Sequence, residues 1–242
     1  MERIPEPELM EEEEQGQIYA QADFSGPNTL FLELFAEKFP HFSGTGAILD
    51  LGCGPADILI RFARQYPACT CVGIDGAEAM LAPGRQAVEQ ERLGDRITLQ
   101  CQYLPCASLS PVLSNSTHQH NRDNQGKQGK TRKGFDVVLS NSLLHHLHNP
   151  AVLWQTLQDN IAPGGMMLIM DLLRPGSPEE ARGFVQRYTA DEPEILQTDF
   201  YNSLLAAFRL DEIRSQLKQA GLALHCEQVS DRHFAVWGTR TL

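Results

Sequence analysis

Runs of apolar residues alternate with helical periodicity along most of the chain. Five runs have the length and composition of strands: AILDLG, CTCVGID, ITLQCQYLP, FDVVLS and MMLIMDLL. Between them, apolar positions recur at helical spacing over residues 56–66, 78–93 and 149–161, the second interrupted at Pro83-Gly84. Because the strands are apolar throughout instead of alternating with polar residues, they indicate a parallel sheet covered by helices on both faces.

Further elements flank this core. Asn28 is a candidate cap for a helix over residues 28–39. Ser177-Pro178-Glu179-Glu180 is a typical helix start, and two helices over about 178–190 and 192–208 predict a small helical cap over residues 176–208. After a helix over 211–220, the runs LALHCEQVS and HFAVWGTR predict an antiparallel hairpin that completes a seven-stranded, mostly parallel α/β sheet.

Two segments differ from the rest in composition. Residues 1–14 contain seven glutamates against one arginine, which is typical of a solvated, mobile tail. Residues 106–134 are polar, basic towards their end and without periodicity, which predicts a disordered surface insertion. We therefore expect an acidic N-terminal segment over 1–27 and one domain over 28–242 that carries the insertion.

Composition excludes several classes of partner. The chain has a formal net charge of −11 and no basic face, which argues against nucleic acid or an anionic membrane. No apolar run approaches the ~20 residues of a spanning helix, and no signal peptide is recognisable. The six cysteines form no CxxC pair, which favours reduced thiols and a cytoplasmic protein. Cys69 and Cys71 share one face of a strand, where core packing and a soft-metal or metalloid site are the alternatives.

Polar side chains gather where the expected strands end. They are Asp50, Asp75, Gln100, Asn141 and Asp171. In parallel sheets, ligands bind beyond the carboxyl ends of the strands. Gly52 and Gly54 follow the first strand and let the backbone approach a ligand closely, and Asp75 has the position of an acid that accepts both hydroxyls of a ribose.

The motifs ILDLGCGPAD, VGIDGAEAML, FDVVLSNSLLHHLHNP and PGGMMLIMDLLRP, in this order, resemble the class I S-adenosylmethionine-dependent methyltransferases. The likeness is to the small-molecule branch that includes the ubiquinone and menaquinone biosynthesis methyltransferases, and it implies a Rossmann-like fold. It also implies S-adenosylmethionine as the cofactor. The residues that it assigns to cofactor binding are Asp50, Gly52, Cys53, Gly54, Asp75, Gly76, Met80, Gln100 and Asn141. Two positions depart from the family pattern: Ala56 replaces the third glycine, and Gln100-Cys101 replaces Gly-Asp.

The same resemblance places LSNSLLHHLHNP beside the methyl end of the cofactor. His145 is then the candidate catalytic residue, with a wall of purely structural role as the alternative. Further candidates on the acceptor side are Tyr19 as part of an N-terminal lid, Asp171, Arg174, Tyr201 and Asn202. Metal binding is not expected, because adjacent His145 and His146 point apart on a regular backbone and no carboxylate or thiol shares the segment.

These features predict a metal-free methyltransferase (EC 2.1.1) that transfers a methyl group in line to a small-molecule acceptor. Three alternatives remain open: an arsenic or other thiol-assisted methyltransferase, a protein or RNA methyltransferase docked by the basic insertion, and a cofactor-binding protein without catalysis. A nicotinamide-dependent oxidoreductase is disfavoured, because the loop reads DxGxGxA instead of GxGxxG. The sequence defines neither the acceptor nor the oligomeric state.

Overall fold

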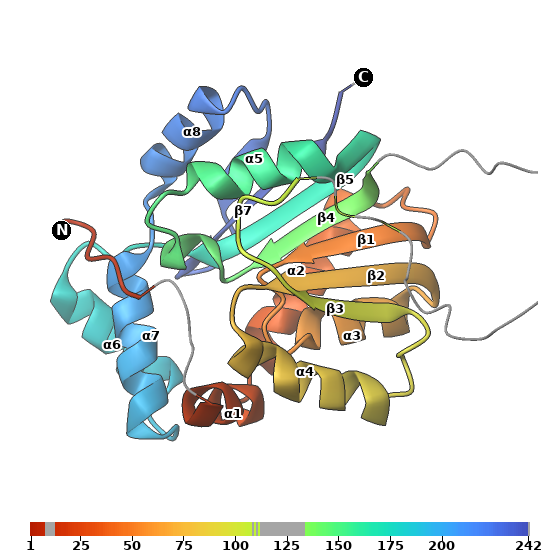
Figure 1. Ribbon diagram of the computed structural model, residues 1–242. Helices are drawn as coiled ribbons and strands as arrows, with labels where there is room; N and C mark the ends of the chain where they lie inside the picture. The colour runs from red at the N-terminus through yellow and green to blue at the C-terminus, as the bar shows by residue number, and fades with distance from the viewer. Residues whose placement is uncertain (8–12, 108, 110, 112–133, 242) are drawn as a thin grey trace, which may run out of the picture.

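The computed structural model describes residues 1–7, 13–107, 109, 111 and 134–241. Its seven strands form one sheet in the order β3-β2-β1-β4-β5-β7-β6, with β7 antiparallel to both of its neighbours. The strands are β1 (Thr45–Leu51), β2 (Ala68–Asp75), β3 (Ile97–Cys101), β4 (Phe135–Asn141), β5 (Ile161–Leu172), β6 (His225–Gln228) and β7 (His233–Thr239). The predicted mostly parallel sheet and its C-terminal hairpin are confirmed (Figure 1).

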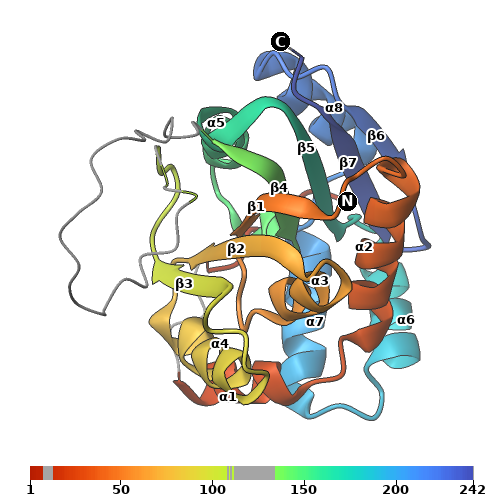
Figure 2. The ribbon, with the colours of Figure 1, turned by 90° about the vertical axis from the view of Figure 1, so that its right-hand side faces the viewer.

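Helices cover both faces of this sheet (Figure 2). One face packs against α2 (Ser25–Lys38), α3 (Asp57–Gln65) and α4 (Glu78–Gln90), through a core that includes Phe31, Phe35 and Leu59. The other face packs against α5 (Ala151–Asn160) and α8 (Leu210–Gln219), around the fully buried Trp154. Cys69 and Cys71 lie in the first core, as the packing alternative predicted.

The cap stands at the carboxyl ends of the strands. It consists of α6 (Pro178–Tyr188) and α7 (Glu194–Ala206), and α1 (Glu13–Gln21) contacts both α7 and α4. The predicted start of α6 is confirmed, since the Glu180 backbone N–H donates to Ser177 Oγ at 3.3 Å. The cap leaves the domain just after β5 and rejoins it beside the point of departure, where Leu173 and Phe208 form an isolated bridge.

Two expected features of the helices were wrong. Helix α2 begins at Ser25, so Asn28 lies inside the helix and is buried, and its side chain donates to Asp57 instead of capping. Helix α4 continues through Pro83, which lies within its second turn.

The acidic run over residues 1–14 was expected to be a solvated, mobile tail within a segment that could also form a lid, yet described residues of this segment contact the domain. The Ile4 N–H donates to Leu205 O at 3.0 Å, and residues 13–21 form α1. Most of the expected basic insertion lies outside the described residues. Its first part contacts α5, where the N–H of Leu109 donates to Asn160 Oδ1 at 2.8 Å. Within the described parts of the chain, no helix combines the length and hydrophobicity needed to cross a membrane.

Candidate active site

One cavity of about 800 Å³ opens at the carboxyl ends of the strands and extends under the cap. Most of the predicted cofactor residues line it: Asp50, Gly52, Cys53, Gly54, Asp75, Gly76, Met80 and Asn141. Tyr19 and His145 line it as well. The sheet edge and the cap therefore contribute to a single site that has two halves, a strand-end half and a cap half.

The loop after β1 forms the floor of the strand-end half. Gly52 has φ +70°, and a Cβ built on it would lie 2.7 Å from Leu143 Cδ1, so this position needs glycine. The N–H groups of Gly52 and Cys53 both donate to Ile74 O, at 2.8 and 3.0 Å. Ala56 adopts the left-handed conformation, with φ +66°, at the start of α3, where the family pattern has glycine.

Asp75 holds this loop against the end of β2. Its Oδ2 accepts from the Gly54 N–H and its Oδ1 accepts from the Ala77 N–H, both at 2.9 Å. Burial raises the pKa of Asp75, while these two hydrogen bonds act in the opposite direction. Because a carboxylate has about four lone-pair sites, both oxygens can still accept further hydrogen bonds from a ligand.

Two buried oxygens in the same half have no hydrogen-bond partner among the described residues. They are Asp50 Oδ1 and Asn141 Oδ1. Asp50 is only 1% exposed, and its burial, together with the nearby Asp75 charge, raises its pKa to about 7. Buried acceptors without donors are costly, so this half of the cavity is built for a ligand that brings hydrogen-bond donors and positive charge.

The cap half is centred on His145, in the short 3₁₀ helix η1 (Leu144–His146). The His145 N–H donates to Asp171 Oδ2 at 3.1 Å, and Nδ1 lies 2.5 Å from Asp171 Oδ1. Burial opposes the charged imidazole, but the charges and hydrogen bond of Asp171, with Glu6, outweigh it and raise the pKa of His145. Asp171 thus fixes the ring and leaves Nε2 facing the cap half.

Glu6 also reaches His145, a contact that sequence reasoning missed. Its Oε1 lies 3.6 Å from His145 Nε2 and accepts from Ser203 Oγ at 3.1 Å. Arg3 holds this segment in place, because its guanidinium donates to the carbonyls of His145 and Leu147 at 2.7 and 3.0 Å. No sequence signal indicated this contact, since residues so far apart along the chain meet only in the fold.

Other candidates lie elsewhere. Gln100 does not line the cavity, whereas Gln102, Tyr103 and Leu104, just beyond the end of β3, do. Arg174 forms an ion pair with Glu212 at 2.5 Å and does not line the cavity.

Tyr201 and Asn202 also lie off the cavity. Tyr201 accepts a hydrogen bond from Arg182 at 3.3 Å, and Asn202 is exposed. The residues of α7 that line the cavity instead are Leu196, Asp199, Phe200 and Ser203.

The expectation that the side chains of His145 and His146 point apart was wrong. The rings of His145 and His146 are tilted by 37° with centroids 4.1 Å apart, because the 3₁₀ turn places both on one side. Among the described residues, His145, His146 and Glu6 are a group whose side-chain ligand atoms lie within 4.8 Å of one another.

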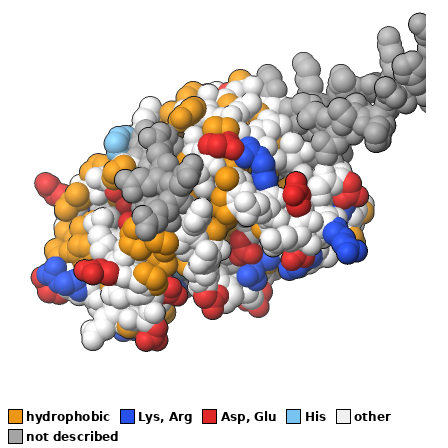
Figure 3. All heavy atoms as spheres, turned by 60° about the horizontal axis from the view of Figure 1, so that its bottom comes forward, with side chains coloured by type: hydrophobic (Ala, Val, Ile, Leu, Met, Phe, Trp, Pro, Cys, Tyr) orange, Lys and Arg blue, Asp and Glu red, His pale blue; other side chains and the backbone are white. Residues whose placement is uncertain are grey.

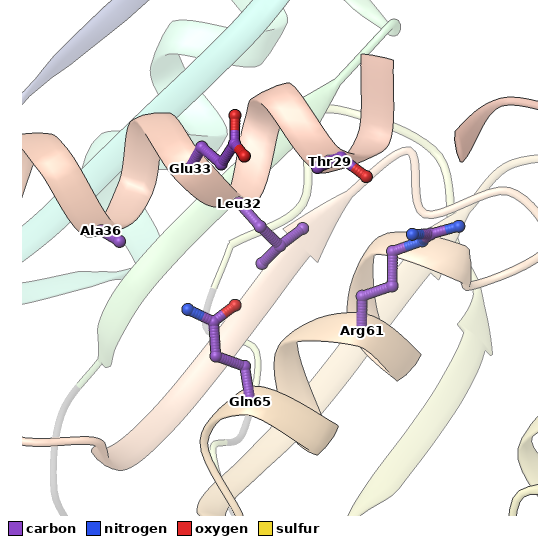
Figure 4. Close-up of a pocket in the computed structure, with 6 residues that line it drawn as sticks. All are labelled: Thr29, Leu32, Glu33, Ala36, Arg61 and Gln65. Atoms are coloured by element: carbon purple, nitrogen blue, oxygen red, sulfur yellow. The ribbon is translucent and has the colours of Figure 1, made fainter. Parts of the chain in front are cut away.

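A second hollow, of about 290 Å³, lies between α2 and α3 (Figure 4). The Arg61 side chain at its rim forms an ion pair with Asp57 at 2.9 Å. On the face shown in Figure 3, acidic and basic side chains are interspersed, and the described residues there form no continuous basic patch.

Comparison with known proteins identifies the family of this chain. A family model described as "Methyltransferase domain" matches residues 24–227. The chain belongs to this methyltransferase family, and its resemblance to S-adenosylmethionine-dependent methyltransferases is confirmed.

Curated relatives match over part of their length. A trans-aconitate 2-methyltransferase of Delftia acidovorans is 29% identical, over 61% of this chain and 45% of its own. A ubiquinone/menaquinone biosynthesis C-methyltransferase of Citrifermentans bemidjiense is 39% identical over 31% of this chain and 32% of its own. An uncharacterized methyltransferase of Mycobacterium bovis is 27% identical over 54% of this chain and 53% of its own. The chain spans about half or less of the length of these relatives.

Solved structures agree in fold at low sequence identity. A plantazolicin methyltransferase in complex with SAH superposes with a TM-score of 0.66 at 16% identity, covering 95% of this chain and 90% of that one. A [4+2]-cyclase superposes with a TM-score of 0.64 at 14% identity, covering 100% of this chain and 99% of that one. At this level of sequence identity the superpositions show only a shared fold, so the function has to be inferred from the residues of the site.

Proposed function

We propose that this protein transfers a methyl group from S-adenosylmethionine to a small-molecule acceptor by in-line displacement. The observation that carries the proposal is the continuity of the cavity, which joins the glycine loop and Asp75 to the His145–Asp171 pair. A donor site and an acceptor site must share one water-excluding space for direct transfer, because displacement requires the two reacting groups in contact and in line.

The residues of the strand-end half fit the cofactor. The unpartnered Asp50 Oδ1 and Asn141 Oδ1 suit a ligand with an ammonium group and hydroxyl donors. Gly52 and Gly54 would cradle its amino-acid part, and Asp75 would hold the ribose hydroxyls. When bound, S-adenosylmethionine supplies a methyl group that its sulfonium makes electrophilic.

His145 acts on the acceptor in this proposal. Asp171 accepts from Nδ1–H and so fixes the tautomer and the ring orientation. Nε2 then takes a proton, or accepts a hydrogen bond, from the acceptor group that attacks the methyl. The raised pKa makes the imidazole a stronger base, which suits an acceptor that holds its proton at neutral pH.

The thiol-assisted alternative receives no support from the cysteines on β2. Burial raises the pKa of Cys69 to about 11 and that of Cys71 further, so neither is a ready thiolate. Neither side chain lines the cavity. All six cysteines are free thiols, in keeping with the reducing cytoplasm that we propose as the location.

A second candidate function is a reaction without methyl transfer, because a [4+2]-cyclase shares the fold. One experiment separates the two: incubation of the protein with methyl-labelled S-adenosylmethionine and a metabolite extract, followed by mass spectrometry. Label in a small molecule, lost in Asp75→Ala, supports the proposal. Cofactor binding without label in any product would refute it and favour the second candidate.

A further inference from the structure

A second histidine lies beside the His145–Asp171 pair, and the proposed transfer does not use it. His233 begins β7, where it pairs with Leu172 of β5, and the adjacent pair joins Phe234 to Asp171. His233 is only 4% exposed and lines the cavity together with Leu172. Its ring is therefore a buried polar group on the wall of the cap half.

The Ser230 hydroxyl fixes which ring nitrogen of His233 carries the proton. Ser230 Oγ accepts from the backbone N–H groups of Arg232 and His233, at 3.2 and 3.0 Å. Because a hydroxyl oxygen has two acceptor sites, both are then occupied, and its O–H is left to donate to His233 Nδ1 across 2.8 Å. Nδ1 is thus an acceptor, and the neutral ring carries its proton on Nε2.

The Nε2–H group of His233 is the donor offered to the cavity. Nε2 makes no hydrogen bond among the described residues, and it is not one of their buried side-chain atoms that lack a partner. Since the residue lines the cavity, this nitrogen is open to a ligand there. Burial, together with the nearby Arg232 charge, lowers the pKa of His233 to about 4, so the ring is neutral at physiological pH. The wall therefore presents a neutral donor in a fixed direction.

The charges around this donor favour a neutral partner. Glu192 and Asp199 line the same half of the cavity, where they would repel a carboxylate. The Arg232 charge is already balanced, because the guanidinium pairs with Asp231 at 3.0 Å and lies over the ring of Tyr188 at 3.4 Å. The carbonyl oxygen of a ketone, ester or amide accepts from an N–H without adding charge.

We propose that the acceptor molecule carries a neutral carbonyl group, whose oxygen accepts from His233 Nε2–H while the group to be methylated faces His145. This inference rests on the proposed function and names a substrate feature that the same site recognises. A carbonyl is favoured over a hydroxyl, because the Leu172 side chain beside the ring offers no acceptor for an O–H. His233 then determines specificity, since it binds the acceptor molecule and takes no part in the proton transfer.

Nitrogen-15 NMR tests the donor in the unliganded full-length protein. Two-bond correlations within the imidazole rings should show His233 as the Nε2–H tautomer, and Ser230→Ala should give a mixture of the two tautomers. An Nδ1–H tautomer in the wild type, or a charged His233 ring at neutral pH, would overturn the proposal.

Binding tests the ligand class without turnover. The full-length protein, loaded with S-adenosylhomocysteine, is titrated by calorimetry with meta- and para-hydroxyacetophenone and with the matched ethylphenols, (hydroxyethyl)phenols and hydroxybenzoates. We expect the ketones to bind at least about fivefold more tightly than the ethylphenols, as one net hydrogen bond provides. His233→Phe should remove this preference, and His233→Gln, which can still present an N–H, should keep part of it. The matched control is His225→Phe, which replaces an exposed ring stacked on Trp237 outside the cavity and should preserve the preference.

Because His233→Phe leaves the Ser230 hydroxyl unpaired and could destabilise the turn, Ser230→Ala serves as a second variant and should reduce the preference less. Equal affinity for ketones and ethylphenols, a preference for the alcohols or the hydroxybenzoates, or no binding by either ketone would overturn the proposal. So would a carbonyl preference that survives His233→Phe. Carbonyl preference in a protein that transfers no methyl would uphold this inference while refuting the proposed function, and methyl transfer to carbonyl-free acceptors alone would do the reverse.

Discussion

Replacing Asp75 by alanine is the most direct test of the strand-end half. The carboxylate accepts two backbone N–H groups, from Gly54 and Ala77, both at 2.9 Å. In the proposed complex it would also accept the two ribose hydroxyls. Asp75→Ala therefore removes the ligand contact and the two hydrogen bonds that shape the loop around the ligand.

The expected loss can be worked from these contacts. A hydrogen bond to a charged group contributes about 1.5–3 kcal/mol. Losing the two to the ribose at the lower end costs about 3 kcal/mol, which weakens cofactor binding by roughly 100-fold. The unpaired Gly54 and Ala77 N–H groups add to this loss, since the loop must be reordered on binding.

Calorimetry with S-adenosylmethionine and S-adenosylhomocysteine measures the change, and thermal unfolding reports on the fold. Asp136→Ala is the matched control: Asp136 Oδ2 accepts from the Ala47 N–H at 2.8 Å near the start of β1, away from the cavity. It should lower stability and leave cofactor affinity unchanged. A folded Asp75→Ala protein that binds within about threefold of the wild type would refute the ribose role.

Three further predictions concern the rest of the site. Gly52→Ala should weaken cofactor binding in calorimetry, because φ is +70° and the new Cβ would meet Leu143; unchanged affinity would contradict this. His145→Ala and Asp171→Asn should each lower kcat by roughly 10²-fold or more, with little change in cofactor affinity. A variant in which cofactor affinity falls by the same factor as kcat would contradict an acceptor-side role. Asp50 has a pKa of about 7 in the fold against about 4 unfolded, so the unfolding free energy should fall as pH rises through 7. A cationic cofactor selects ionised Asp50, so its affinity should rise over the same range and Asp50→Asn should flatten the profile.

The strand-end half could be predicted from the sequence because its residues follow from local pattern. Asp50, Asp75, Asn141 and Asp171 end apolar strands, and in a parallel sheet such ends share an edge. Gln100 does not line the cavity, and the residues near the end of β3 that do, Gln102, Tyr103 and Leu104, follow the last strand residue, Cys101.

The cap half could not be predicted in the same way. Residues 196, 199, 200 and 203 line the cavity at the spacing of one helical face, and Tyr201 and Asn202 lie off that face. The face that a helix turns to a cavity depends on packing, which composition does not define. Glu6 was missed for a related reason: an acidic run looks solvated until an arginine in it, here Arg3, ties it to the domain.

The bridge between Leu173 and Phe208 has a consequence for how this methyltransferase domain could diversify. The cap begins and ends at neighbouring points, so α6 and α7 form an insertion between β5 and α8. This insertion could be exchanged as a unit without changing the strand order of the sheet. The exchange would leave the glycine loop and Asp75 in place while replacing the Asp199 and Ser203 wall. A library of grafted caps on this domain should therefore vary in acceptor range and keep a common cofactor affinity.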